Sequence, residues 1–402
     1  MKLRAAHGIL LSLVTGCGDD GANTSGVDAS SAGTGTATGS ASTSGTASTG
    51  SGTGGEGGSG GDPQATTPYV YVGTSADRIF VMLLDRDTGG LSPVGDIDGG
   101  PNPSFLASDP EHRYLFAANE GSSEVSSFAI EPSDGTLTFI SRVDSQGSGP
   151  AHDSGSWLFA AHYGSGHAAS IAIASDGTLD DTVVSVELAG QNAHQIRQDP
   201  VSGVVYVPCL GSNYVTYFGF SASDGVLDPP PGGSELDLPA GSGPRHLEFH
   251  PTLPVAYVIN ELGDSIVVAS RDPSGPLTEI QTVPTLPDDG FDPDDNACAD
   301  IHITPDGRFL YGSNRGHNTL AIYGVDAQSG MLTALGHEPT GGNWPRNFSI
   351  DPAGEILLVA NQQSDMIQTF RIDGATGLLT PLVATPTNGG PAFVGVFAQP
   401  LR

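Results

Sequence analysis

Short runs of β-branched and aromatic residues alternate with clusters of proline, glycine and aspartate along most of this 402-residue chain. The runs are too short for helices and none shows a sustained 3.6-residue period, so the pattern predicts strands joined by tight turns. One phrase, a turn cluster followed by a strand that often ends in asparagine, recurs several times. Its copies occupy residues 109–119, 199–210, 250–260, 304–314 and 351–361, with a truncated copy at 154–162. The chain is therefore built from repeats, which take precedence in assigning a fold.

Each repeat has room for four strands. A short strand precedes the turn, as at residues 104–108, 246–250, 301–304 and 347–351, and a second strand follows it. In the best copy two more strands follow, at 125–130 and 137–143. Four strands in a unit of roughly 48 residues are typical of a β-propeller blade.

The second strands number seven, at residues 69–73, 114–119, 157–162, 204–210, 255–260, 309–314 and 356–361. The first unit lacks a strand before it, whereas residues 392–397 form a first strand with no successor. Pairing these two segments completes a blade and removes the exposed edges of an open array. The sequence therefore predicts an all-β, seven-bladed β-propeller closed by its N- and C-terminal strands. A sandwich or two smaller domains is the less favoured alternative.

The first 66 residues do not fit the repeats and are interpreted as an export leader and a tether. A positively charged start precedes an apolar run at 9–14, which is too short to span a bilayer and is typical of a signal peptide. The run leads to Val14-Thr15-Gly16-Cys17, which resembles a bacterial lipobox with Cys17 as the lipidated residue. An ordinary cleaved signal is the alternative. We expect a signal peptide at 1–17, a disordered Gly/Ser/Thr-rich tether at 18–66 and the propeller at 67–402, lipid-anchored at the cell envelope and facing the periplasm or the surface.

Composition narrows the set of partners. The net charge of −31 disfavours nucleic acid and anionic lipid headgroups as ligands. Cys209 and Cys298 are interpreted as two separate buried thiols, with a single disulfide as the open alternative. The acidic segment 288–295 lacks the spacing of a calcium loop and is interpreted as a solvated insertion. We expect neither a metal site nor a cofactor.

Several polar residues are predicted to meet at one mouth of the channel. In a blade the first strand lines the channel and the second runs antiparallel to it, so first-strand starts and second-strand ends lie on the same face. Arginine is scarce in this chain, yet three arginines fall at these positions beside histidines and glutamates. Buried charges require partners or a ligand, so the set predicts a binding or active site. Its members are Asn102, Glu120, His194, Arg245, His246, Glu261, His302, Arg315 and Arg346.

Short phrases surround these residues: Asn102-Pro103-Ser104-Phe105, Gly243-Pro244-Arg245-His246, Asn260-Glu261-Leu262, Ala299-Asp300-Ile301-His302, Ser313-Asn314-Arg315-Gly316 and Trp344-Pro345-Arg346-Asn347. Over residues 68–398 the chain resembles the lactonase family of seven-bladed propellers, which includes propeller-type 6-phosphogluconolactonases and fungal carboxymuconate-lactonising enzymes. The resemblance implies a catalytic set of His194, Glu261, Arg245 and Arg315. Arg346, His246, His302, Asn102 and Glu120 would then bind the substrate.

The chain departs from the family in two places. Asn192 stands where the family often has a histidine, and the third repeat is several residues shorter before Trp157.

Two functions are consistent with the sequence. The favoured one is an exported lipoprotein lactonase that hydrolyses a sugar-derived or related lactone. His194 or Glu261 would act as the general base, while Arg245 and Arg315 would stabilise the oxyanion or hold a substrate anion. Export argues against the cytoplasmic metabolite 6-phosphogluconolactone as the substrate. The alternative is a non-catalytic surface propeller that binds a ligand or a protein partner through the same mouth.

Overall fold

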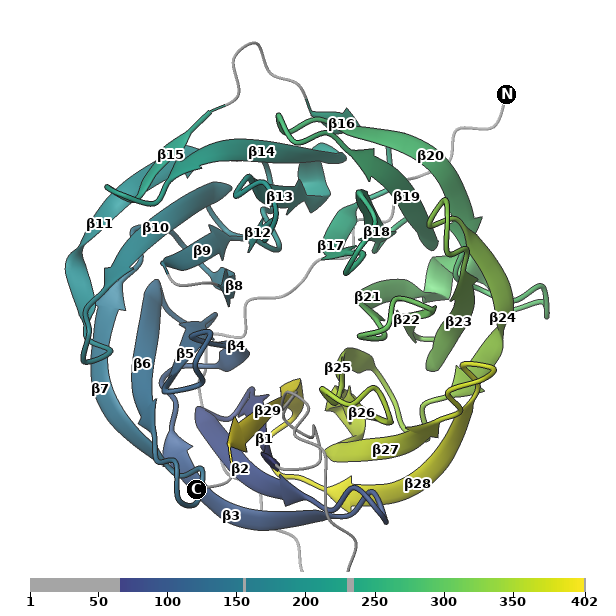
Figure 1. Ribbon diagram of the computed structural model, residues 1–402, viewed down its shortest axis with the longest axis horizontal. Coiled ribbons are helices and arrows are strands. Elements are labelled where there is room, and N and C mark those ends of the chain that lie inside the picture. Colours follow the sequence, from purple (N-terminus) through teal and green to yellow (C-terminus); the bar gives the residue numbers. More distant parts are fainter. Residues whose placement is uncertain (1–65, 155–156, 230–234, 401–402) are drawn as a thin grey trace, which may run out of the picture. The chain divides into compact units, whose positions relative to one another are not determined.

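Seven antiparallel sheets, six of four strands and one of five, are arranged in a ring in the computed structural model, which describes residues 66–154, 157–229 and 235–400 (Figure 1). These residues all belong to one compact unit, Ser59–Arg402. The expected leader, the tether and Cys17 lie outside the described residues. In the part of the chain that is described, no helix is long and apolar enough to cross a bilayer.

Each blade is one antiparallel sheet. Blade one contains β29 (Pro391–Pro400), β1 (Thr66–Thr74), β2 (Arg78–Leu84) and β3 (Leu91–Asp98). Blade two contains β4 (Pro103–Ser108), β5 (Tyr114–Asn119), β6 (Glu124–Ile130) and β7 (Leu137–Asp144). Blade three contains β8 (Pro150–Ser154), β9 (Leu158–His162), β10 (His167–Ile173) and β11 (Leu179–Leu188). In blade four, β12 (Arg197–Gln198), β13 (Val205–Cys209) and β14 (Tyr214–Ser221) are followed by β15 (Val226–Asp228) and β16 (Leu236–Asp237), which both pair with β14.

The remaining blades are regular. Blade five contains β17 (Pro244–Phe249), β18 (Val255–Asn260), β19 (Ser265–Arg271) and β20 (Leu277–Pro284). Blade six contains β21 (Ala297–Ile303), β22 (Phe309–Arg315), β23 (Thr319–Val325) and β24 (Leu332–Pro339). Blade seven contains β25 (Pro345–Ile350), β26 (Ile356–Asn361), β27 (Met366–Ile372) and β28 (Leu379–Pro386). The helices within the described residues are short 3-10 turns, η1 (Leu210–Ser212), η2 (Pro293–Asp295) and η3 (Gln362–Ser364).

The recurring turn phrase closes the hairpin between the first and second strands of a blade. In blade seven, Asp351 Oδ1 accepts hydrogen bonds from the backbone N–H groups of Glu355 at 2.7 Å and Ile356 at 2.9 Å. Gly354 takes the left-handed conformation, with φ of 72°, that lets the chain reverse. The aspartate therefore satisfies the turn's donors while the glycine supplies the geometry.

The ring closes through the predicted pairing of its two ends. Strand β29 runs antiparallel to β1, in a register that places Tyr69 opposite Phe397 and Gly73 opposite Phe393. Thr66 and Pro400 lie opposite each other at the far end of this pair. The seven-bladed, all-β fold and its closure by the terminal strands are confirmed.

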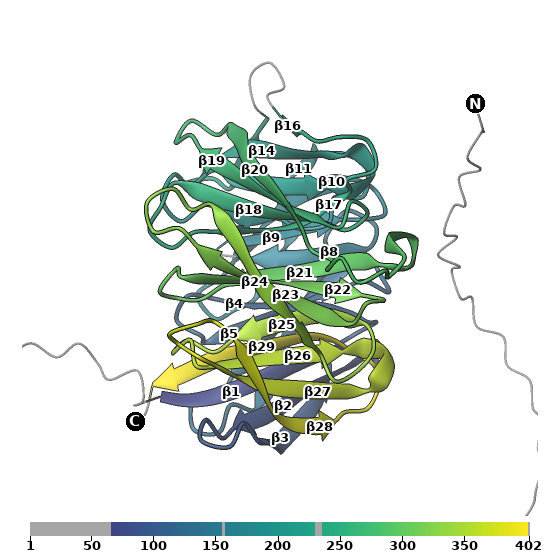
Figure 2. The ribbon, with the colours of Figure 1, turned by 90° about the vertical axis from the view of Figure 1, so that its right-hand side faces the viewer.

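Adjacent blades are joined by apolar side chains and by a recurring tyrosine. The blades stack face against face in the side view (Figure 2), and side chains from neighbouring sheets form the core clusters. The hydroxyl of a second-strand tyrosine donates to a glycine carbonyl in the next blade's outer turn. These bonds are Tyr71 to Gly135 at 2.8 Å, Tyr206 to Gly275 at 2.7 Å, Tyr257 to Gly330 at 2.9 Å and Tyr311 to Gly377 at 2.8 Å.

The two cysteines are separate and buried, as interpreted from the sequence. Burial raises the pKa of both the Cys209 and the Cys298 thiol. Much of the acidic segment 288–295 is exposed and includes η2.

Candidate functional site

A repeated backbone motif opens five of the seven inner strands. The residue before the strand's first proline has a positive φ, and the residue after that proline is an unpaired bulge. In blade five, Pro244 pairs with Asn260 and His246 with Ile259, so Arg245 between them is the extra residue. A bulge re-aims the side chain it carries. Arg245 in blade five and Arg346 in blade seven occupy this position.

A second repeated position lies beside the first. The residue after the second strand donates its N–H to the carbonyl of the positive-φ residue, as from Glu261 to Gly243 at 2.7 Å and from Glu120 to Asn102 at 2.9 Å. First-strand starts and second-strand ends therefore share one face of the ring. The backbone brings Arg245 and Arg346 to the same mouth as Glu120 and Glu261.

Two guanidinium groups share one carboxylate at this mouth. Arg245 Nε lies 2.9 Å and Arg315 Nη2 lies 2.8 Å from the same oxygen, Glu261 Oε2. Burial and the neighbouring charge of Arg315 lower the pKa of Arg245 to about 9. Burial acts to raise the pKa of Glu261, but Arg315 and Arg245 hold it below its usual value. The glutamate is therefore an ionised anchor for two cations.

A second ion pair crosses the mouth. Arg346 Nη2 lies 2.7 Å from Glu120 Oε2 and joins blade seven to blade two past blade one. Burial opposes ionisation of Glu120, yet the charge of Arg346 keeps its pKa below the usual value. Three arginines and two glutamates thus leave the mouth with one net positive charge, in a chain whose net charge is −31.

His194 lies in a narrow neck below these charges. A cavity of about 10 Å³ is lined by Ser104, Phe105, His194, Arg245, His246, Arg346, Asn347 and Ala392. Such a space holds about one water molecule. Burial, with Arg245 and His246 nearby, lowers the pKa of His194 well below 6.5. Its buried Nδ1 has no hydrogen-bond partner among the described residues. His194 is therefore a neutral imidazole with a ring nitrogen available for a water or a substrate group.

His246 is held in one orientation by a buried aspartate. Its Nδ1 lies 2.7 Å from Asp300 Oδ1, and its Nε2 lies 3.3 Å from Arg245 Nη1. Since a guanidinium only donates, Nε2 accepts from Arg245 and Nδ1 carries the proton that Asp300 accepts. Burial and Arg245 lower the pKa of His246 to about 4, so it is neutral near pH 7. Asp300 therefore fixes the orientation of the His246 ring, and the ring in turn helps to hold the guanidinium group of Arg245 in place.

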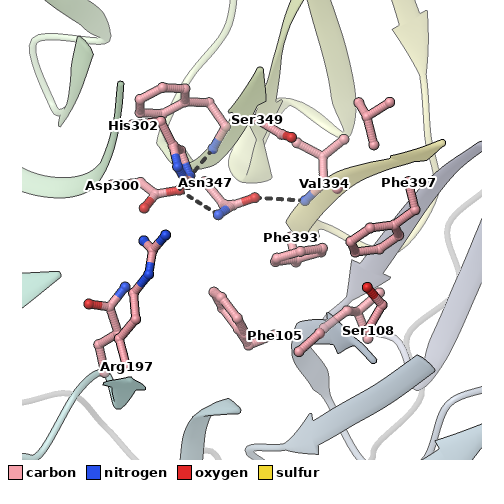
Figure 3. A pocket seen from close by; sticks show the side chains of 16 residues that line it. Phe105, Ser108, Arg197, Asp300, His302, Asn347, Ser349, Phe393, Val394 and Phe397 are labelled. Atoms are coloured by element: carbon pink, nitrogen blue, oxygen red, sulfur yellow. Dashed lines mark hydrogen bonds and ion pairs between the residues drawn. The ribbon is translucent and has the colours of Figure 1, made fainter. Parts of the chain in front are cut away.

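Past the neck, the channel widens to a chamber of about 310 Å³ (Figure 3). Phe105, Phe393 and Phe397 line one side, and Arg197, Asp300 and His302 lie on the other. The charges of the polar side are paired, because Glu248 binds Arg197 Nη2 at 2.7 Å and His302 Nδ1 at 3.2 Å. His302 Nε2 lies 3.2 Å from Asp300.

Although burial acts in the opposite direction, Asp300 and Glu248 raise the pKa of His302 to about 10. The chamber is therefore lined by the imidazolium of His302 and the guanidinium of Arg197, and carboxylates balance both positive charges.

Most residues predicted for the mouth lie there, and one does not. Glu120, His194, Arg245, His246, Glu261, Arg315 and Arg346 gather at the mouth and its neck. His302 was expected at the mouth, but β21 begins at Ala297, so His302 is the sixth residue of its strand and lines the chamber. Asn102 contributes through its backbone, because its φ is 52° and its carbonyl accepts hydrogen bonds from Ser104 and Glu120.

Sequence reasoning missed Arg197, Glu248 and Asp300. A usable signal is present, because polar residues recur two apart on or directly before four inner strands: Gln195 and Arg197, His246 and Glu248, Asp300 and His302, Asn347 and Ser349. Residues two apart on a strand point to the same face. Within the described residues, no group of three or more His, Cys, Asp or Glu side chains is arranged to hold a metal ion.

Comparison with known proteins agrees with this architecture. A family model described as "Lactonase, 7-bladed beta-propeller" matches residues 69–396. The 6-phosphogluconolactonase of Bacillus subtilis (strain 168) is 31% identical over 304 residues, which cover 71% of this chain and 86% of that protein. The 6-phosphogluconolactonase of Pectobacterium carotovorum subsp. carotovorum (strain PC1) is 36% identical over 291 residues, covering 70% and 84%.

Among solved structures, the periplasmic gluconolactonase of Pseudomonas aeruginosa superimposes with a TM-score of 0.76 at 29% identity, over 83% of this chain and 100% of that one.

Proposed function

The chain belongs to the lactonase family of seven-bladed β-propellers, and from this premise we propose that it hydrolyses a sugar-derived or related lactone at the channel mouth. The observation that carries the proposal is the pair of buried guanidinium groups fixed by Glu261 beside the neutral imidazole of His194. Lactone hydrolysis needs a base for water and fixed positive charge for the oxyanion. Both requirements are met within one cluster.

The reaction follows from the charge states of these groups. His194 accepts a proton from a water held in the neck, and the water oxygen attacks the lactone carbonyl. Arg245, with Arg315 beside it, stabilises the negative charge that develops on the carbonyl oxygen. The ring C–O bond then breaks, and the proton held by His194 passes to the leaving alkoxide. The product is the open hydroxy acid.

Glu261 is the weaker candidate for the base. Its carboxylate oxygen Oε2 is already held by two arginines, whereas Nδ1 of His194 has no hydrogen-bond partner among the described residues and is open to a water. We therefore assign Glu261 to holding Arg245 and Arg315, and Arg346 with Glu120 to binding the substrate's polar groups at the mouth.

The direct test is a panel of lactones assayed by acid release. Unphosphorylated aldono-1,5-lactones, 6-phosphogluconolactone and simple aliphatic lactones should be compared, with and without a chelator. We expect turnover of at least one sugar lactone that the chelator does not alter. A folded protein that binds lactones without releasing acid would instead support the non-catalytic ligand-binding propeller.

The pH dependence should identify the base. Because the pKa of His194 is lowered well below 6.5, the imidazole stays unprotonated as the pH falls through 6.5. We expect kcat/KM to be level from pH 8 to below 6.5 and to fall only at more acidic pH, with His194→Gln losing about 10²–10⁴-fold in rate. An acidic limb centred near 6.5 would contradict this assignment, and so would an active H194Q protein.

We further propose that the propeller works outside the cytoplasm on a lipid anchor at Cys17. This proposal rests on the leader and lipobox resemblance of residues 1–17, and a related gluconolactonase is named as periplasmic. In bacterial cells that express the full chain, the protein should fractionate with membranes, and Cys17→Ser should shift it to the soluble fraction. Wild-type protein in the soluble fraction would argue against the anchor. An extracytoplasmic location favours an unphosphorylated lactone as substrate.

A further inference from the structure

Trp344 has a backbone conformation that bulky residues rarely adopt. The residue before an inner-strand proline has positive φ in five blades, with φ of 52° at Asn102, 62° at Gly149, 63° at Gly243, 64° at Trp344 and 63° at Gly390. Glycine and asparagine reach this left-handed region at low cost, whereas a bulky side chain is strained there. Blade seven therefore carries a strained tryptophan where its sister blades carry glycine or asparagine.

Hydrogen bonds to the main chain hold this conformation from both sides. The N–H of Trp344 donates to Asn318 Oδ1 at 2.8 Å, and its carbonyl accepts from the N–H of Gln362 at 3.0 Å. The preceding N–H, of Asn343, donates to Ser364 Oγ at 2.7 Å. None of these contacts involves the indole. Strained residues that are held in this way cluster at functional sites.

The indole covers one face of Arg315. The Cζ atom of Arg315 lies 5.3 Å from the ring centroid of Trp344, within the range of a cation–π interaction. The edges of the same guanidinium group are engaged elsewhere, by the carbonyls of Ala297 at 3.1 Å and Cys298 at 2.9 Å and by Glu261 at 2.8 Å. Arg315 is therefore fixed along its edges by backbone and carboxylate, and across its plane by the ring.

We propose that Trp344 is a positioning residue that fixes the plane of Arg315 toward the reacting carbonyl. Its catalytic consequence rests on the proposed lactone hydrolysis, whereas its contact with Arg315 does not. Because the Arg315 side chain is only 8% exposed, its attraction to the ring is weakly screened by solvent. The backbone strain at Trp344 is therefore accepted because the indole ring orients the guanidinium group of Arg315.

The first experiment compares Trp344→Gly, which installs the residue found in blades one, three and five, with Trp344→Tyr, which keeps an aromatic face. On a lactone that the wild type hydrolyses, W344G should lose about 5- to 20-fold in kcat with little change in KM, and W344Y should keep most of kcat. W344G should keep the wild-type urea midpoint, because relief of backbone strain offsets the lost ring contacts. Unchanged kcat in W344G, or an equal loss of kcat in W344Y, would overturn the proposal.

The second experiment tests whether Trp344 acts through Arg315. In an Arg315→Ala background, W344G should cause no further loss of kcat, because residues that act as a unit are not additive. Losses that multiply would overturn the proposal. If the wild type hydrolyses no lactone, the proposed function fails, and the contact is judged from unfolding free energies of the same four proteins. Non-additive values support the Trp344–Arg315 contact, and additive values contradict it.

Discussion

Replacing Arg245 with alanine should lower kcat/KM for lactone hydrolysis by about 10²–10³-fold, the usual cost of removing one oxyanion donor. Three features of this side chain predict so large an effect. The side chain is 3% exposed, it shares the carboxylate of Glu261 with Arg315, and its Nη1 donates a hydrogen bond to His246 Nε2. The loss should appear mainly in kcat, because the negative charge that Arg245 meets develops only in the transition state.

The matched control is Arg308→Ala. Arg308 is an exposed arginine paired with exposed Asp306 and precedes β22, at the end of that strand away from Arg315. Its removal should leave kcat/KM within about twofold of wild type, since exposed ion pairs contribute little. Urea unfolding of R245A must accompany the kinetics, because its loss leaves Glu261 paired with Arg315 alone. A folded R245A protein with unchanged turnover would remove Arg245 from the mechanism.

A chain that ends at Gly390 should fail to fold. The deletion removes β29 and leaves β1 as an open edge in which Tyr69, Val70, Tyr71 and Val72 are at most 6% exposed in the closed ring. Phe393, Val394 and Val396 are also lost from the core. Burying three such side chains contributes about 5–9 kcal/mol, which is comparable to the net stability of a typical domain. We expect no cooperative urea transition and little soluble protein.

A circular permutant is the control for this deletion. It moves the chain termini away from the β1–β29 pair but keeps β29 in place. Because Thr66 and Pro400 pair at the end of the β1–β29 ladder, a short linker can join them. New termini fit at Gly290, where an added side chain would meet nothing within 4 Å. This permutant keeps every strand and should fold and hydrolyse lactone as the original order does. A truncated chain as stable as the permutant would show that β29 is dispensable.

The fold was predictable because its signal is distributed over the whole chain. Each turn phrase is a weak signal alone, but six in series predict six blades, and the unmatched strands at the two ends predict the seventh blade and its closure. The arginines of the site were predictable for a similar reason, since Arg245 and Arg315 are scarce residues at recurrent strand ends.

The site residues that were misplaced or missed depend on where each inner strand begins and on its pairing register with the second strand. Inner strands of blades two, five and seven begin at a proline, Pro103, Pro244 and Pro345, but β21 begins at Ala297 and gives no such marker. His302 was consequently expected too close to the mouth. Asp300 and Glu248 were missed because a bulge decides which face of each inner strand meets the channel, and a shift of one residue reverses every side chain.

The repeated mouth motif has a consequence for how new chemistry could arise in this ring. Five of the seven blades offer the same two attachment points, one at the inner bulge and one after the second strand, and blade four offers the second; all are set by main-chain bonds. In blade one the bulge carries Ala392, and after the second strand blade four carries Leu210. A single codon change at either place would add an acid, a base or a cation to the rim while leaving the scaffold intact. Divergence in substrate preference can therefore proceed blade by blade, without the backbone having to be rebuilt.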